Sequence, residues 1–286
     1  MGATCPLSCG QRRVGAEMRS LSRRVWLLSA FLAIVLVLPG ELRADLLGDV
    51  RGRGALRVAI AGSVPPYNAY RPDGAAEGSD VDIARALARD LGVRLETVRI
   101  TNSERVAVLR SRRADVVVSA LSITPERERQ IAFSVPYGSI GVLIAAPRPL
   151  QLSSLLDLKG RRVGVLAGSS NFEHLLRHVP EARLLAYAEH DLLVSAYLAG
   201  DFEIMSATGN VVADVNARQP RRPLVEQFQQ TEFDLAVGMP KGEKALRDWI
   251  NAWIVARLRD QSLAAIHFRH HRHSPLTVPR PAAVGR

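Results

Sequence analysis

The stretch Ser119-Ala120-Leu121-Ser122-Ile123-Thr124-Pro125-Glu126-Arg127 carries more information about the fold than any other part of the chain. It follows an apolar segment, residues 114–118, that predicts a buried strand. Thr124 reads as a helix N-cap and Pro125 as the first helical residue, where its missing N–H costs nothing. Arg127 then falls in the first turn, where the helix dipole disfavours a cation. Hydroxyls, backbone N–H groups and a guanidinium at the end of a strand favour a bound carboxylate or phosphate. The alternative is a surface helix with a solvated arginine.

Further motifs surround this stretch. Pro65-Pro66-Tyr67, Gly78-Ser79-Asp80-Val81-Asp82 and Leu91-Gly92 precede it, and Ala132-Phe133-Ser134-Val135-Pro136-Tyr137 follows it. In this order they resemble the N-terminal lobe of the bacterial extracellular solute-binding proteins that supply polar amino acids to ABC importers. The resemblance is strongest over residues 57–144 and continues more weakly to about residue 268. It implies the type II periplasmic-binding-protein fold, an α/β fold with two lobes. Each lobe would be a mostly parallel sheet flanked by helices, and the ligand cleft would lie between the lobes.

The first 44 residues have the layout of a secretory signal peptide. Basic residues precede an apolar run over residues 25–38, and Leu42-Arg43-Ala44 provides a cleavage point before Asp45. This run is shorter than the ~20 residues that a membrane span needs, although an uncleaved anchor remains the alternative. The sequence leaves open whether translation starts at Met1 or Met18, and whether export follows the general or the twin-arginine route.

The positions of the cysteines and the distribution of basic residues argue against several classes of protein. Both cysteines, Cys5 and Cys9, lie in the leader, so the mature chain has no thiol for a disulfide, a metal or a nucleophile. The formal charge of +10 falls to about +6 without the leader, which holds six arginines and two glutamates. The remaining basic residues are spread without interleaved aromatics, which argues against nucleic-acid binding. We therefore expect a soluble, monomeric periplasmic protein.

Short apolar segments alternate with amphipathic ones along the mature chain, which predicts repeated strand–helix units and mostly parallel sheets. We expect lobe one over 45–143, lobe two over 144–236, a return to lobe one over 237–273 and a disordered tail over 274–286. The chain would cross between the lobes near residues 139–149 and 226–239. A single long helix is predicted over residues 243–269.

The resemblance also implies a ligand site. Arg127 would clamp a ligand carboxylate from lobe one, with contacts from Ser119, Ala120 (through its backbone) and Ser122 beside it. In lobe two, Ser169 and Ser170 after a glycine would present a second helix N-terminus across the cleft. In lobe one, Tyr67 would form an apolar wall of the cleft. The alternatives are strand-end turn residues, simple helix capping and a core aromatic, respectively.

Three positions depart from the family pattern. Thr208 stands where many members have an aspartate that pairs with the ligand α-ammonium, and a hydroxyl brings no charge to offset a desolvated cation. Val64 and Ser79 stand where members have aromatic residues. The anion half of the site is therefore expected to be intact and the ammonium half altered. Either the ligand is no standard α-amino acid, or another acid such as Glu173 supplies the charge.

The leading hypothesis is a periplasmic receptor that captures a small carboxylate-bearing solute, closes by a hinge motion, and docks on an ABC permease. An enzyme resembling cyclohexadienyl dehydratase is the first alternative, although the segment after Thr208 offers no carboxylate for acid–base work. A sensor module for a separate signalling partner is the second. No cofactor is expected. No metal is expected either, because the histidines at 267, 270, 271 and 273 read as a solvated run.

Overall fold

The computed structural model describes Gly2, residues 45–271 and residues 276–277. The described residues from Asp45 onward form one compact unit, and all four clusters of buried apolar side chains lie within it. This unit therefore contains its own hydrophobic core. Apart from Gly2, the predicted leader, with both cysteines and Met18, lies outside the described residues. Within the described part of the chain, no helix has the length and apolarity that crossing a membrane requires.

Lobe one is built on a five-stranded sheet of order β5-β1-β6-β13-β7. β1 (Ala55–Ile60) lies parallel to both β5 (Arg94–Arg99) and β6 (Val116–Val117). β13 (Gly238–Met239) lies antiparallel between β6 and β7 (Ala132–Phe133). The two parallel pairs follow from the predicted strand–helix alternation, whereas β13 joins the sheet from a distant part of the chain.

Helices cover both faces of this sheet because successive strand residues point to opposite sides. Leu56, Val58 and Ile60 of β1 pack in a cluster with the long helices, and Ala59 packs in a second cluster with the short helix α4. The helical elements of lobe one are α2 (Leu46–Arg53), α3 (Ser79–Leu91), η1 (Asn102–Glu104), α4 (Arg105–Arg110), α5 (Pro125–Glu128), α9 (Lys244–Arg259) and α10 (Ser262–His270). A small antiparallel sheet is formed by β2 (Ser63–Val64), β3 (Asn68–Tyr70) and β4 (Ala76–Glu77).

Lobe two repeats the plan with a sheet of order β10-β9-β11-β8-β12. β9 (Arg162–Leu166) lies parallel to both the edge strand β10 (Arg183–Tyr187) and β11 (Ile204–Ala207). Helices α7 and α8 pack on one face, and α6 packs on the other. The helical elements of lobe two are η2 (Leu155–Leu158), α6 (Ser170–His178), α7 (His190–Ala199) and α8 (Gly209–Arg218).

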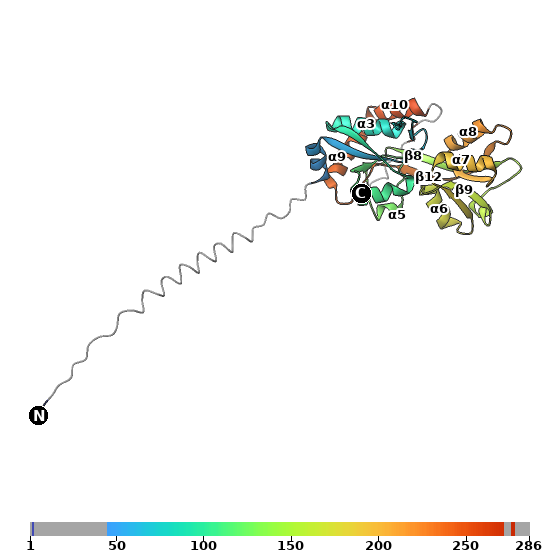
Figure 1. Cartoon of the computed structure of the whole chain (residues 1–286), viewed down its shortest axis with the longest axis horizontal. Coiled ribbons are helices and arrows are strands. Elements are labelled where there is room, and N and C mark those ends of the chain that lie inside the picture. The colour runs from blue at the N-terminus through green and yellow to red at the C-terminus, as the bar shows by residue number, and fades with distance from the viewer. Residues whose placement is uncertain (1, 3–44, 272–275, 278–286) are drawn as a thin grey trace, which may run out of the picture. The chain divides into compact units, whose positions relative to one another are not determined.

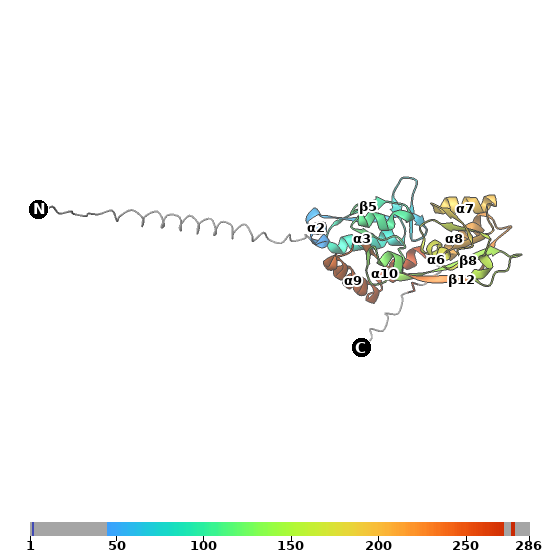
Figure 2. The same ribbon diagram turned by 90° about the horizontal axis from the view of Figure 1, so that it is seen from below.

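Two long antiparallel strands join the lobes (Figures 1 and 2). β8 (Gly138–Pro147) leaves lobe one and β12 (Leu224–Leu235) returns to it, paired from Gly138 with Leu235 to Pro147 with Leu224. Both run through the predicted crossings. β8 continues unbroken past residue 143, so the first lobe boundary proposed from the sequence falls within a continuous strand, whereas the second, after residue 236, lies between β12 and β13. The two-lobed α/β fold class is confirmed.

The prediction of a single terminal helix is wrong, because the structure has two helices in this region. α9 ends at Arg259, and α10 starts at Ser262 after Gln261 adopts a left-handed conformation with φ of 62°. The break turns α10 so that it packs against α3. Tertiary packing therefore overrides a continuous helical pattern here.

Two expectations for the C-terminal region also need correction. His267 and His271 are buried rather than solvated, with their rings stacked at a centroid distance of 3.9 Å. Within the tail predicted to be disordered, Leu276 packs on the lobe-one core, and Thr277 O accepts a hydrogen bond from Ser139 N at 2.8 Å. The rest of that tail, like His273, lies outside the described residues.

Candidate functional site

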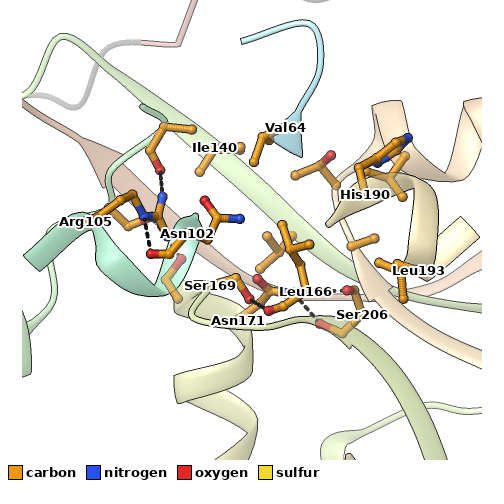
Figure 3. Close-up of a pocket in the computed structure, with 17 residues that line it drawn as sticks. Val64, Asn102, Arg105, Ile140, Leu166, Ser169, Asn171, His190, Leu193 and Ser206 are labelled. Atoms are coloured by element: carbon orange, nitrogen blue, oxygen red, sulfur yellow. Dashed lines mark hydrogen bonds between the residues drawn. The ribbon is translucent and has the colours of Figure 1, made fainter. Parts of the chain in front are cut away.

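A cavity lies between the lobes, with about 570 Å³ of empty space that is partly open to solvent (Figure 3). Lobe one, the crossing strand β8 and lobe two all contribute side chains to it. The lining residues are Val64, Asn102, Arg105, Ala120, Ser122, Ile140, Val142, Leu166, Ser169, Ser170, Asn171, His190, Leu193, Ser206, Ala207, Thr208 and Val211. The lining therefore combines eight apolar side chains with nine polar ones, which gives a ligand both an apolar surface and groups that fix its orientation.

The turn after β6 is held by a buried carboxylate. Asp80 at the start of α3 accepts hydrogen bonds from Ala120 N at 2.7 Å, Asn68 Nδ2 at 2.8 Å and Tyr137 Oη at 2.9 Å. Burial raises the pKa of Asp80 to about 6. Ala120 has a φ of 42°, a conformation that costs a non-glycine residue energy and is maintained by these bonds. Its N–H is therefore occupied and not offered to a ligand.

The two predicted serines of this turn have different environments. Ser119 lies outside the cavity lining, and its hydroxyl accepts a hydrogen bond from Ala61 N at 2.9 Å, which ties the turn to the end of β1. Ser122 lines the cavity, and its hydroxyl lies 2.9 Å from that of Ser170 in lobe two. Ser122 is thus placed for ligand contact, whereas the bonding of Ser119 is structural.

Arg105 is the arginine that lines the cavity. Its guanidinium donates to three carbonyl oxygens of lobe one, Asn102 O at 3.1 Å, Ser119 O at 2.9 Å and Ala120 O at 3.2 Å. It also donates to Gly168 O of lobe two at 2.9 Å. Burial, followed by the charge of Arg127, lowers the pKa of Arg105 to about 9, so the group remains a cation at neutral pH.

Arg127, the predicted clamp, lies beside the cavity and not in its lining. It is 3% exposed and donates to Ser122 O at 3.1 Å within lobe one. Across the cleft its Nη2 donates to Gly168 O at 3.1 Å and to Glu173 Oε1 at 2.9 Å. Two arginines of lobe one therefore converge on a single carbonyl oxygen of lobe two. A ligand role for Arg127 stays a prediction.

Two polar side chains of the lining have no hydrogen-bond partner among the described residues. They are Asn102, whose Oδ1 and Nδ2 are both unpaired, and Thr208, whose Oγ1 is unpaired. Buried polar groups in proteins are nearly always paired, so each exception needs an explanation. Asn102 belongs to lobe one, and Thr208 occupies the N-cap position of α8 in lobe two without a side-chain capping bond, so each lobe has one unsatisfied side chain in the cavity lining.

In lobe two, Ser169 and Ser170 both line the cavity at the start of α6. Ser169 Oγ accepts from Phe172 N at 3.2 Å, which is the capping role that the sequence left as an alternative. Below them, Asn171 Nδ2 donates to Ser206 Oγ at 2.8 Å, and Ser206 Oγ donates to Gln230 Oε1 at 2.6 Å. The polar groups of Asn171, Ser206 and Gln230 therefore pair with one another, and this hydrogen-bonded network fixes the lobe-two side of the cavity.

Two other candidates lie elsewhere. Tyr67 is buried against the lobe-one core with its ring 4.4 Å from that of His271, and it lines a second cavity, shared with Thr208 and Asn210 of lobe two, rather than this one. Glu173 is also absent from the lining, because it pairs with Arg127. No Asp or Glu side chain is among the residues that line the cavity.

Sequence reasoning missed Arg105 and Asn102. Arg105 shares the buried face of α4 with Val108 and Leu109, three and four positions later. A charged residue on the apolar face of an amphipathic helix is a sequence signal that could have identified it. Asn102 carries no such signal, because its unpaired state depends on how the lobes meet.

Comparison with known proteins identifies the group to which the chain is similar. The bacterial extracellular solute-binding proteins, family 3, match residues 56–273. The L-cystine-binding protein TcyJ of Escherichia coli K12 is 27% identical over 223 residues, which are 77% of this chain and 84% of that protein. A cyclohexadienyl dehydratase of Pseudomonas aeruginosa is 27% identical over 236 residues, 80% of this chain and 87% of the enzyme.

The fold is also found among solved structures. The crystal structure of a solute receptor for L-cysteine of Neisseria gonorrhoeae superposes with a TM-score of 0.72 at 23% identity, covering 79% of this chain and 93% of the receptor. This confirms the type II architecture, with a cleft between two α/β lobes. With the family match spanning most of the chain, the protein belongs to family 3 of the bacterial extracellular solute-binding proteins.

Proposed function

We propose that the protein captures a small carboxylate-bearing solute, an amino acid or a related organic acid, and delivers it to an ABC-type permease. The observation that carries this proposal is the convergence of Arg105 and Arg127 on Gly168 O, at 2.9 and 3.1 Å. A carboxylate is a stronger acceptor for guanidinium groups than a neutral carbonyl. A ligand carboxylate that enters when the lobes part would therefore replace Gly168 O as the acceptor.

The charge of the cavity supports the same class of ligand. Its lining contains the cationic Arg105 and no carboxylate. An α-ammonium group would meet only neutral acceptors such as Thr208 Oγ1, which offset the cost of burying a cation less well than a carboxylate does. The carboxylate is thus the group that the site matches best.

Capture would proceed by a hinge motion about β8 and β12, the strands that join the lobes. Ligand contacts to both lobes stabilise the closed form, which the permease recognises. We propose that the mature chain works as a monomer in the periplasm after removal of residues 1–44, with no nucleic-acid partner and no catalytic turnover. Relatives named as binding proteins, such as the cystine-binding protein, support this assignment.

Thermal unfolding of residues 45–286 against amino acids, dicarboxylic acids and keto acids tests the proposal. A ligand at 100 times its dissociation constant stabilises the protein by about 2.7 kcal/mol, a shift of a few degrees. Arg105→Met should abolish that shift. Arg110→Met is the matched control, because Arg110 lies at the exposed end of the same helix. Absence of a shift with every carboxylate would contradict the proposal.

A dehydratase-like activity is the second candidate. The observation in its favour is that His190 lines the cavity while its Nε2 lies 3.0 Å from Asp214 Oδ2, a pair able to exchange a proton with a ligand. Incubation with prephenate or arogenate, followed by detection of the aromatic product, tests it. Turnover lost in His190→Asn would establish an enzyme in place of a receptor.

A further inference from the structure

Asn102 is held rigidly at the edge of the cavity. The preceding residue, Thr101, and Glu104 form a capping box around η1, with Thr101 N donating to Glu104 Oε2 at 2.8 Å. The backbone oxygen of Asn102 accepts from Arg105 Nε at 3.1 Å. Figure 3 shows the Asn102 side chain beside Arg105, among the residues that line the cavity. The amide is therefore preorganised, and its position does not depend on a mobile loop.

The amide of Asn102 is buried and unsatisfied. The residue is 3% exposed, and neither Oδ1 nor Nδ2 has a partner among the described residues. An amide buried without hydrogen bonds destabilises the fold, whereas an apolar residue of similar shape would not. The side chain thus offers one acceptor and two donors to whatever occupies the cavity.

Building on the proposed function, we propose that Asn102 determines ligand specificity by binding a distal carboxamide or ureido group. Such a group presents a hydrogen-bond donor and an acceptor side by side. It can pair with Oδ1 and Nδ2 of Asn102 at the same time, while the ligand carboxylate binds the arginines. An apolar side chain would leave both amide atoms unpaired, and sites built to hydrogen-bond a ligand reject analogues that lack the group.

Charged distal groups fit less well. A distal carboxylate satisfies Nδ2 but places negative charge against Oδ1. A distal ammonium satisfies Oδ1 but leaves Nδ2 unpaired, and it approaches the guanidinium of Arg105, which is bonded to the backbone of Asn102 itself. Thr208 on the opposite lobe does not discriminate between these groups, because a hydroxyl either donates or accepts.

Calorimetric titration of residues 45–286 with two matched series tests the inference. One series is glutamine, citrulline, glutamate, norleucine and lysine. The other is glutaramate, glutarate and hexanoate, the counterparts of glutamine, glutamate and norleucine without the α-ammonium. We expect the carboxamide or ureido member to bind at least about tenfold more tightly than the apolar member. Asn102→Leu should reduce this ratio to within about threefold, with affinity for the apolar acid retained or increased.

Two further variants keep the test decisive. Asn251→Leu is the control, because Asn251 lies on α9 and accepts a hydrogen bond from Val135 N, away from the cavity. Asn102→Asp is nearly isosteric, so it should fold even if the leucine variant does not, and it should shift preference toward lysine. Equal binding of all acids to the parent protein, or an unchanged ratio in both Asn102 variants, would overturn this inference alone. Failure of every acid to bind would overturn the proposed function as well.

Discussion

Arg127 Nη2 in lobe one donates a hydrogen bond to Glu173 Oε1 in lobe two over 2.9 Å, so an ion pair joins the lobes beside the cavity. Arg127 is buried, whereas the side chain of Glu173 is 31% exposed. A second pair, Arg177 with Glu126 at 2.5 Å, also links the lobes. The closed arrangement is therefore stabilised by contacts within the protein itself, and a ligand adds to them.

Glu173→Gln should weaken the closed form in the absence of ligand. Glu173 is partly exposed and a glutamine still offers an amide oxygen to the buried Arg127, so loss of the charge costs about 1 kcal/mol, roughly a fivefold change in the ratio of closed to open molecules. Small-angle scattering should then report a larger radius of gyration. Glu181→Gln is the control, since Glu181 pairs with Lys159 inside lobe two. Identical scattering from both variants would show that the Arg127–Glu173 pair does not hold the cleft closed.

Asp80→Ala should destabilise lobe one by about 3 kcal/mol and weaken ligand binding. The change leaves the N–H of Ala120, the hydroxyl of Tyr137 and the amide of Asn68 without the carboxylate that accepts from them. Denaturant unfolding measures the loss. Asp80→Asn retains acceptor capacity and should cost less, and Asp191→Ala should be neutral because that side chain is exposed. Equal stability of the alanine variants at 80 and 191 would contradict the role assigned to Asp80.

Gly164→Ala should destabilise lobe two by about 1–3 kcal/mol. A Cβ at residue 164 would lie 2.1 Å from Cζ of Phe202, a fully buried ring that has no room to move. Gly52→Ala is the matched control, because Gly52 is helical and its Cβ would meet nothing within 4 Å. That variant should be slightly stabilised. The midpoint of urea unfolding compares the two, and a Gly164 variant as stable as its parent would refute the packing argument.

Acidification should destabilise the fold through His271. Burial, with the charges of His267 and His270, lowers the pKa of His271 to about 3, whereas an unfolded histidine titrates near 6.5. Between these two pKa values the unfolded chain binds one proton more than the folded chain. The contribution of neutral His271 to the free energy of unfolding is therefore complete above about pH 6.5 and is lost as the pH falls toward 3.

Asp80 acts in the opposite direction. Its pKa of about 6 in the fold exceeds the unfolded value, so its contribution is complete below about pH 4 and is lost as the pH rises through 6. Comparing the parent with His271→Gln isolates the histidine. The free energy of unfolding of the parent should fall more steeply between pH 6.5 and 4 than that of the variant. His178→Gln, at an exposed position, should follow the parent, and parallel curves for the parent and the 271 variant would contradict the assignment.

Much of the fold could be predicted because its signals are local. Thr124 does cap a helix that begins at Pro125, and the strand–helix order through β1, α3 and β5 follows from apolar periodicity. The site was only partly predictable. Of the predicted ligand residues, the cavity is lined by Ala120, Ser122, Ser169, Ser170 and Thr208, whereas Arg127, Ser119 and Tyr67 lie outside its lining. Their contacts with a ligand stay predictions.

The sequence by itself determined the class of fold, the family and the turn that carries the arginine, because these depend on residues a few positions apart. Only the tertiary structure decided that Arg105 faces the cavity, that Asn102 is left unpaired and that Gly168 O bridges two guanidinium groups. Arg105 and Gly168 are 63 residues apart and belong to different lobes. Their contact depends on where the surfaces of the two lobes meet, which no local pattern encodes.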